Sequence, residues 1–206
     1  MSIITSVKIQ EKDKNRCNVM VDGEFSFSLS IDLIIKYGIK KDVDIINLPI
    51  DEIKKEDSKI YALNLAVKYL SRSLKTKKQV VTYLNNKGFD YDVISFVVDK
   101  LKEYNYINDE EYAKRYLETK SNSEGKRLSD YKLMMKGIKK TDIDSARENV
   151  DIDSKESAFL IAQKKIKNKE ITIENLSKVY RCLVGKGFSY EEANFAISKL
   201  KEDVID

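Results

Sequence analysis

Side chains that could bind a polyanion are concentrated in one stretch of this sequence. No acidic residue lies between Asp57 and Asp90, and the stretch contains seven basic residues: Lys59, Lys68, Arg72, Lys75, Lys77, Lys78 and Lys87. Solvated helix faces usually mix both signs, because like charges one turn apart repel each other. An uninterrupted basic run therefore favours binding to a polyanion or to an acidic protein surface. The alternative is that these residues only keep a helix in solution.

Two further basic patches follow later in the chain. The first consists of Lys126, Arg127, Lys132, Lys136, Lys139 and Lys140, interrupted by Asp130. The second consists of Lys164, Lys165, Lys167 and Lys169. The patches either line one track together with the first run, or they are helix-end charges that interact with the helix dipole.

Other kinds of chemistry have little support. The 206-residue chain contains no histidine, which excludes histidine bases, triads and histidine-ligated metals, and its two cysteines are far apart. The acidic cluster Asp109–Glu111 could bind a metal, but carboxylates are also favoured at a helix N-terminus. The twelve tyrosines either pack between repeated units of the chain or stack on nucleic-acid bases. We therefore expect a protein that is not an enzyme and uses no metal or other cofactor.

The first fifty residues have the pattern of a small β-rich cap. Apolar residues alternate with polar ones around Val7 and again around Val19 and Phe27, as in half-buried strands. Asp22-Gly23 predicts a tight hairpin turn, since both of its central residues need positive φ. We expect a short helix at 30–37 and another strand at 43–46.

From about Ile50 onward the apolar period becomes helical. One stripe is predicted to face the core: Ile60, Leu63, Val67, Leu70 and Leu74. On the same helix, Lys68, Arg72 and Lys75 would share the opposite face.

The helical part repeats itself. Gly88, Gly137 and Gly187 are spaced by 49 and 50 residues, each four positions after a leucine, with apolar residues at matching offsets beyond them. Each glycine follows a lysine and predicts a helix end in the left-handed conformation. Capping boxes are predicted to begin at Thr76, Asn108, Asp153 and Ser189.

These signals predict a mainly α protein built from tandem three-helix, helix-turn-helix-like repeats. The predicted divisions are a cap at 1–50 and repeats at 57–104, 105–152 and 153–204. Each repeat is expected to hold a long helix followed by two shorter ones. Stacked repeats of this kind form an elongated, curved solenoid.

The chain resembles the RecX family of bacterial regulators of the RecA recombinase. The matching segments are YLSRSLKTKKQVVTYLNNKGF from Tyr69, YINDEEYAKRYLETK from Tyr106, GKRLSDYKLMMKGI from Gly125 and KGFSYEEANFAISKL from Lys186. The resemblance implies a non-catalytic protein that lies in the groove of the RecA–DNA filament and inhibits ATPase activity and strand exchange. Lys75-Thr76 and Gln79-Val80 depart from the family's usual Arg-Ser and Glu-Leu.

Two other functional classes remain open. One is a free-standing nucleic-acid-binding module, which would bind single- or double-stranded DNA without recombinase. The other is a peptide-binding helical scaffold, which would present an apolar groove. We expect a cytoplasmic monomer that regulates DNA recombination and repair, with no membrane partner, since no stretch approaches the ~18 apolar residues of a membrane span.

Overall fold

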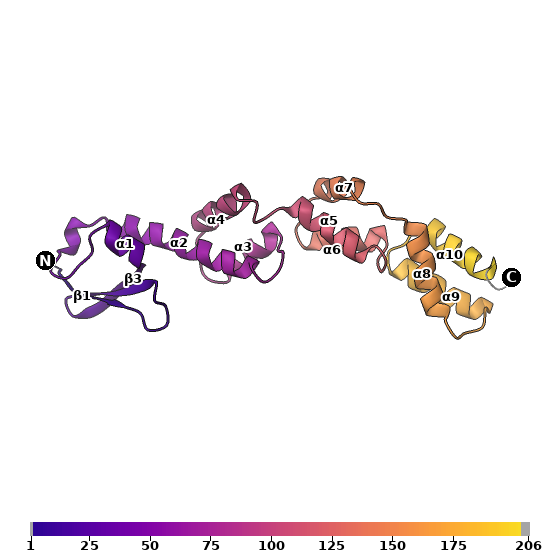
Figure 1. Cartoon of the computed structure of the whole chain (residues 1–206), viewed down its shortest axis with the longest axis horizontal. Helices are drawn as coiled ribbons and strands as arrows, with labels where there is room; N and C mark the ends of the chain where they lie inside the picture. Colours follow the sequence, from indigo (N-terminus) through magenta and orange to yellow (C-terminus); the bar gives the residue numbers. More distant parts are fainter. Residues whose placement is uncertain (1, 203–206) are drawn as a thin grey trace. The chain divides into compact units, whose positions relative to one another are not determined.

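The structure is a computed structural model that describes residues 2–202, so the last two positions of the predicted third repeat lie outside the described residues. The chain begins with a three-stranded sheet and continues with helices (Figure 1), which confirms the mainly α class with a small β-rich cap. The chain divides into two compact units. The first contains residues 2–73 and 80–106, and the second contains residues 74–79 and those from Ile107 onward.

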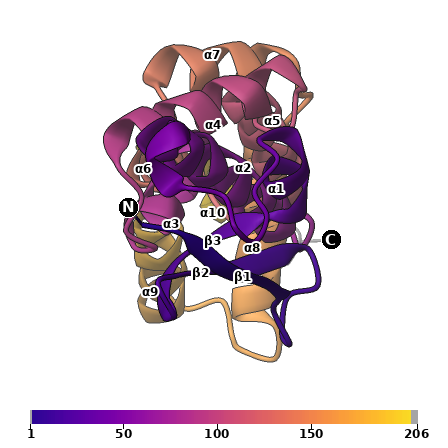
Figure 2. The same ribbon diagram turned by 90° about the vertical axis from the view of Figure 1, so that its left-hand side faces the viewer.

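The cap is an antiparallel sheet in the order β1 (Ile4–Ile9), β2 (Arg16–Val21) and β3 (Glu24–Ser30). Its strands lie side by side in Figure 2. Asp22 and Gly23 have φ values of 51° and 91°, which confirms the predicted hairpin turn.

Helix α1 (Ile31–Lys36) follows β3 directly, as expected for residues 30–37. The predicted strand at 43–46 is wrong. Asp44 makes a single bridge to Ile3, and a 3₁₀ turn follows at Ile45–Asn47, because the Asp44 side chain accepts a hydrogen bond from the N–H of Ile46.

Helix α2 (Ile50–Leu70) connects the cap to the helices that follow it. Ile53 is fully buried in the core of the cap. One turn later, the buried carboxylate of Asp57 accepts a hydrogen bond from the Ser30 N–H at 2.8 Å and pairs with Arg16 at 2.7 Å. The first half of α2 is therefore part of the cap.

The predicted apolar stripe of α2 is partly wrong. Val67 and Leu74 are exposed, and the residues buried on the C-terminal half of the helix are Ala62 and Ala66. The helix also ends at Leu70, so the predicted helix face shared by Lys68, Arg72 and Lys75 is wrong as well. The basic run continues into the turn after α2 instead.

Nine helices of the described chain form three successive triplets. They are α2, α3 (Lys77–Asn85) and α4 (Tyr91–Glu103); α5 (Asp109–Lys120), α6 (Lys126–Met135) and α7 (Lys140–Glu148); and α8 (Ser154–Ile166), α9 (Ile173–Gly185) and α10 (Tyr190–Glu202). In each triplet the first helix packs against the third. The expected order of one long and two shorter helices is wrong for the last triplet, whose helices all have 13 residues. The predicted repeat boundaries and the curvature of the array stay predictions.

Local signals account for the helix ends. The four predicted capping side chains all accept a hydrogen bond from the backbone N–H three residues later, at 2.9–3.3 Å. Gln79 and Glu192 also bond back to the cap N–H groups, completing two capping boxes. The three repeat glycines have φ values of 83°, 87° and 89°, the left-handed conformation expected after a helix.

Within the second unit, two of these glycine turns are packed against the start of another helix. Thr76, at the start of α3, donates its hydroxyl to the Lys136 carbonyl at 2.8 Å. Before α6, the N–H of Gly125 donates to the Lys186 carbonyl at 2.9 Å. A Cβ on Gly187 would lie 2.3 Å from the backbone nitrogen of Leu128. These Lys-Gly turns therefore both end helices and pack against the first residues of another helix.

Candidate polyanion-binding surface

In the first unit, the basic run emerges at the end of α2. Lys68 lies in the last turn of the helix and Arg72 in the turn that follows, and both side chains are exposed. Among residues 2–202, neither makes an ion pair with a carboxylate. Both charges are therefore available to an external partner.

A pair of tyrosines lies beside these cations. The rings of Tyr69 and Tyr83 stack with their centroids 4.3 Å apart and only 7° between their planes. The ammonium of Lys87 lies 5.8 Å from the centre of the Tyr83 ring. The two half-buried rings lie on α2 and α3, so they pack on each other within the first triplet, and the packing of tyrosines between repeats stays a prediction. Tyr91, Tyr104 and Tyr106 remain exposed.

The turn before α3 and the first residues of α3 belong to the second unit and carry three predicted site residues. Lys75 is half-buried, whereas Lys77 and Lys78 are exposed. The Lys78 ammonium donates to the Met135 carbonyl at 3.1 Å, and its stem covers Gly137. Lys78 therefore holds α3 against the turn after α6, in addition to contributing positive charge to the surface.

The second predicted patch contains basic residues in two different states. Lys126, Arg127 and Lys139 are exposed and make no ion pair within the described chain. Lys136 is half-buried, with its ammonium 5.7 Å from the centre of the Tyr112 ring. Lys140, in contrast, is held by two carboxylates, those of Asp130 at 2.8 Å and Asp144 at 2.7 Å.

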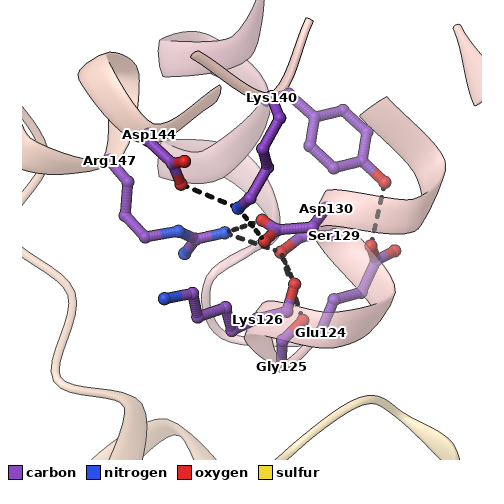
Figure 3. Close-up of polar contacts among 9 residues, drawn as sticks. Glu124, Gly125, Lys126, Ser129, Asp130, Lys140, Asp144 and Arg147 are labelled. Carbon is purple, nitrogen blue, oxygen red and sulfur yellow. Dashed lines mark hydrogen bonds and ion pairs between the residues drawn. The ribbon is translucent and has the colours of Figure 1, made fainter. Parts of the chain in front are cut away.

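Asp130 is the centre of the polar network drawn in Figure 3, where Lys140 and Arg147 both point toward it. It is 8% exposed, and Arg147 reaches its other oxygen at 2.5 Å. Arg147 also donates to the Ser129 hydroxyl, which in turn donates to the carbonyls of Gly125 and Lys126. The network therefore fixes the first turn of α6, which packs against the Lys186-Gly187 turn.

The charges of this network follow from its hydrogen bonds. Burial by itself would raise the pKa of Asp130, but the hydrogen bonds from Lys140 and Arg147 outweigh it and lower the pKa below its ordinary value. The pKa of Lys140 is raised, first by its hydrogen bond to Asp130 and then by that to Asp144. Asp130 is thus a structural anchor, whereas the sequence suggested only an interruption of a basic patch. The sequence did contain one signal for this role. Asp130 stands seven residues before Gly137, and the equivalent positions before Gly88 and Gly187 hold Val81 and Tyr180, so a carboxylate replaces an uncharged side chain at this position.

The third predicted patch lies at the end of α8. Lys164 and Lys165 are in its last turn and Lys167 follows it; all three are exposed and make no ion pair with any described residue. The positions of these lysines agree with both earlier interpretations, because cations at a helix C-terminus also interact favourably with the dipole. The predicted single track through all three patches stays a prediction.

The acidic cluster at the start of α5 is engaged in contacts within the chain. Asp109 accepts from the N–H of Lys77 at 2.8 Å, Glu110 from the hydroxyl of Ser145 at 2.6 Å, and Glu111 pairs with Arg115 at 2.7 Å. These contacts favour the capping interpretation over a metal site.

Comparison with known proteins identifies the family. A family model described as the RecX N-terminal domain matches residues 2–46, and one described as the first three-helix domain of RecX matches residues 62–101. The regulatory protein RecX of Clostridium botulinum (strain Eklund 17B) is 37% identical over 196 residues, covering 93% of this chain and 92% of that protein. The chain belongs to the RecX family. RecX of Clostridium perfringens (strain 13) is 38% identical over 205 residues, covering 97% of both chains.

Solved RecX structures agree with this result. A crystal structure of regulatory protein RecX matches with a TM-score of 0.70 and 25% identity, covering 97% of this chain and all of that one. RecX from Lactobacillus salivarius matches with a TM-score of 0.63 and 28% identity, covering 71% of this chain and 98% of that one. The chain is therefore a member of a regulatory family. Its acid-free basic run lies almost entirely within the matched first three-helix domain.

None of the helices in the described part of this RecX-family chain is long and apolar enough to cross a membrane.

Proposed function

We propose that this RecX-family chain binds the RecA–DNA filament in its groove and inhibits the recombinase's ATPase activity and strand exchange. The observation that carries the proposal is the acid-free run at 58–89, from which Lys68 and Arg72 emerge exposed and without an ion pair in the described chain. Charges of this kind keep their full attraction for an acidic protein surface or for phosphates.

The remaining patches would add further contacts along the same filament. Lys126, Arg127 and Lys139 form one group, and Lys164, Lys165 and Lys167 form another. Each contact made by one group holds the next group near its own site, so several weak contacts combine into strong binding. In this proposal the protein is a cytoplasmic monomer that acts by binding its partner. It catalyses no reaction and uses no metal or other cofactor.

The experiment is RecA ATPase activity on single-stranded DNA with increasing amounts of this protein. We expect ATP hydrolysis to fall at amounts stoichiometric with RecA, and the inhibition to weaken as salt screens the contacts. Unchanged hydrolysis at stoichiometric amounts in low salt would contradict the proposal.

A second candidate function is binding to DNA without recombinase. The exposed rings of Tyr91, Tyr104 and Tyr106, which lie in the same unit as Lys68 and Arg72, favour it, since single-strand binders combine aromatic rings with cations. Gel shifts with naked single- and double-stranded DNA over a salt series distinguish the two functions. Tight DNA binding that falls steeply with salt, together with no effect on RecA, would favour this second function.

A further inference from the structure

In the second and third triplets the second helix packs against the third, and the crevice along this contact is filled differently in the two triplets. In the second triplet, the crevice is closed by Asp130, seven residues before Gly137, and Arg147, ten residues after it. The positions with the same offsets from Gly187 are Tyr180 and Ile197. The ion pair of the second triplet is thus replaced by two apolar side chains in the third.

In the third triplet this crevice is an open groove of about 340 Å³ between α9 and α10. Its lining residues are Ile173, Leu176, Ser177, Tyr180, Arg181, Ile197 and Lys201. Those on α9 follow a spacing of three or four residues, which places them on one face of the helix. Ile173 is 87% exposed, so an isoleucine at the edge of the groove is left open to solvent. An exposed apolar face of this kind is typical of a site where another helix packs.

The charge at the edge of the groove is positive. Among the described residues, no carboxylate lines the groove, and the two charged side chains in its lining are Arg181 and Lys201. Within residues 2–202 neither makes an ion pair; the Arg181 Nε–H donates only to the Ser177 carbonyl of its own helix. Glu174, also on α9, is held by Lys178 at 2.7 Å, and Glu202 follows Lys201 outside the lining.

We propose that this groove is a docking site for an amphipathic helix of a partner protein whose apolar face is flanked by carboxylates. The apolar side chains of that helix would cover Ile173, Tyr180 and Ile197, and its acidic residues would pair with Arg181 and Lys201. The site is separate from Lys68, Arg72 and the other basic residues predicted from the sequence, none of which is among its lining residues. The proposal does not depend on RecA being the partner.

The probe is a fluorescein-labelled peptide of about 14 residues, with leucines at helical spacing flanked by glutamates. Its control has the same leucines flanked by lysines. By fluorescence anisotropy, we expect the acidic peptide to bind at least about tenfold more tightly than the basic one. The methyl resonances of Ile173 and Ile197 should shift on binding.

Ile173→Glu and Arg181→Glu should each weaken binding of the acidic peptide about tenfold or more. Both side chains are exposed, so neither change should unfold the triplet. The matched control is Ile35→Glu, at another isoleucine that is 73% exposed but lies on α1, and it should leave binding unchanged.

The proposal would be overturned by no binding of the acidic peptide, by equal binding of both peptides, or by binding that Ile173→Glu leaves intact. Dimerisation in sedimentation experiments that Ile173→Glu abolishes would instead assign the groove to a second copy of this chain, and would equally overturn it.

Discussion

The Lys-Gly turn of the first unit and the two Lys-Gly turns of the second unit differ in how tightly they are packed. In the first unit, the Gly88 turn is open, with no atom within 4 Å of a Cβ added there, whereas added Cβ atoms at Gly137 and Gly187 in the second unit would collide with neighbours. The basic residues at the end of α2 also differ from those of the Asp130 network. Lys68 and Arg72 have no carboxylate partner among the described residues, whereas Lys140 and Arg147 share Asp130.

This difference separates basic side chains that hold the fold together from those that can bind a partner. Charge counting along the chain treats Lys68 and Lys140 alike, but a lysine already paired with two carboxylates has little attraction left for an external anion. Contacts within the fold therefore decide which basic residues can bind a partner. In the first unit, Lys68 and Arg72 are such residues.

The largest effect on stability is expected for Asp130→Ala. The change leaves the Arg147 side chain, which is 20% exposed, and the Lys140 ammonium without their shared carboxylate. Removing one partner of a buried ion pair usually costs about 3–5 kcal/mol of unfolding free energy. Urea denaturation of the full chain measures the loss.

The control for this change is Asp144→Ala, which breaks an ion pair whose two side chains are about half exposed. Its loss should stay below about 1 kcal/mol. Equal losses in the two variants would mean that the Asp130 network does not hold the second unit together.

The glycine turns should show the next largest difference. Alanine at Gly187 would place a Cβ 2.3 Å from the Leu128 nitrogen in addition to the cost of its positive φ, and should destabilise the protein by about 3 kcal/mol. Alanine at Gly88 should lower the unfolding free energy only by the cost of positive φ, about 1 kcal/mol, because no neighbour lies near the added Cβ. Thermal unfolding of both variants compares them, and a Gly88→Ala variant as unstable as Gly187→Ala would show that the open turn is also packed.

A smaller effect is expected in acid. Because the folded-state pKa of Asp130 is lowered from its ordinary 3.8, the carboxylate contributes stability that is complete above that value and is lost as pH falls through the lower folded pKa. The unfolding free energy of the wild type should therefore fall more steeply below pH 3.8 than that of Asp130→Asn. Parallel curves for the two proteins would exclude a lowered pKa at this position.

Local features of the fold could be predicted from the sequence. The capping residues Thr76 and Ser189 act on backbone groups within three residues, and Gly88 determines its own turn, so no distant partner is needed. The hairpin at Asp22-Gly23 is local in the same sense. Repetition of these signals was enough to predict three helix triplets.

Features that depend on distant partners could not be predicted in this way. Asp130 pairs with Arg147, 17 residues away. The C-terminal half of α2 buries Ala62 and Ala66 instead of the predicted larger side chains, because the first half of the helix is held in the cap by the Asp57–Arg16 pair. The same limit applies to the candidate site. The sequence locates Lys68 and Lys140, but only the tertiary contacts show that Lys140 is paired.

The smallest effect on stability, and the largest on function, is expected for the double variant Lys68→Glu with Arg72→Glu. Both side chains are exposed, so unfolding free energy should change by less than about 0.5 kcal/mol. The matched control, Lys12→Glu with Lys14→Glu, changes the net charge equally at two exposed lysines between β1 and β2.

The most direct test is the concentration of each protein that halves RecA ATPase activity on single-stranded DNA. We predict that this concentration rises at least about tenfold for the Lys68/Arg72 double variant, equivalent to about 1.4 kcal/mol of binding, and stays within about twofold of wild type for the Lys12/Lys14 control. Equal inhibition by the two double variants would contradict the claim that the unpaired cations at the end of α2 bind the filament.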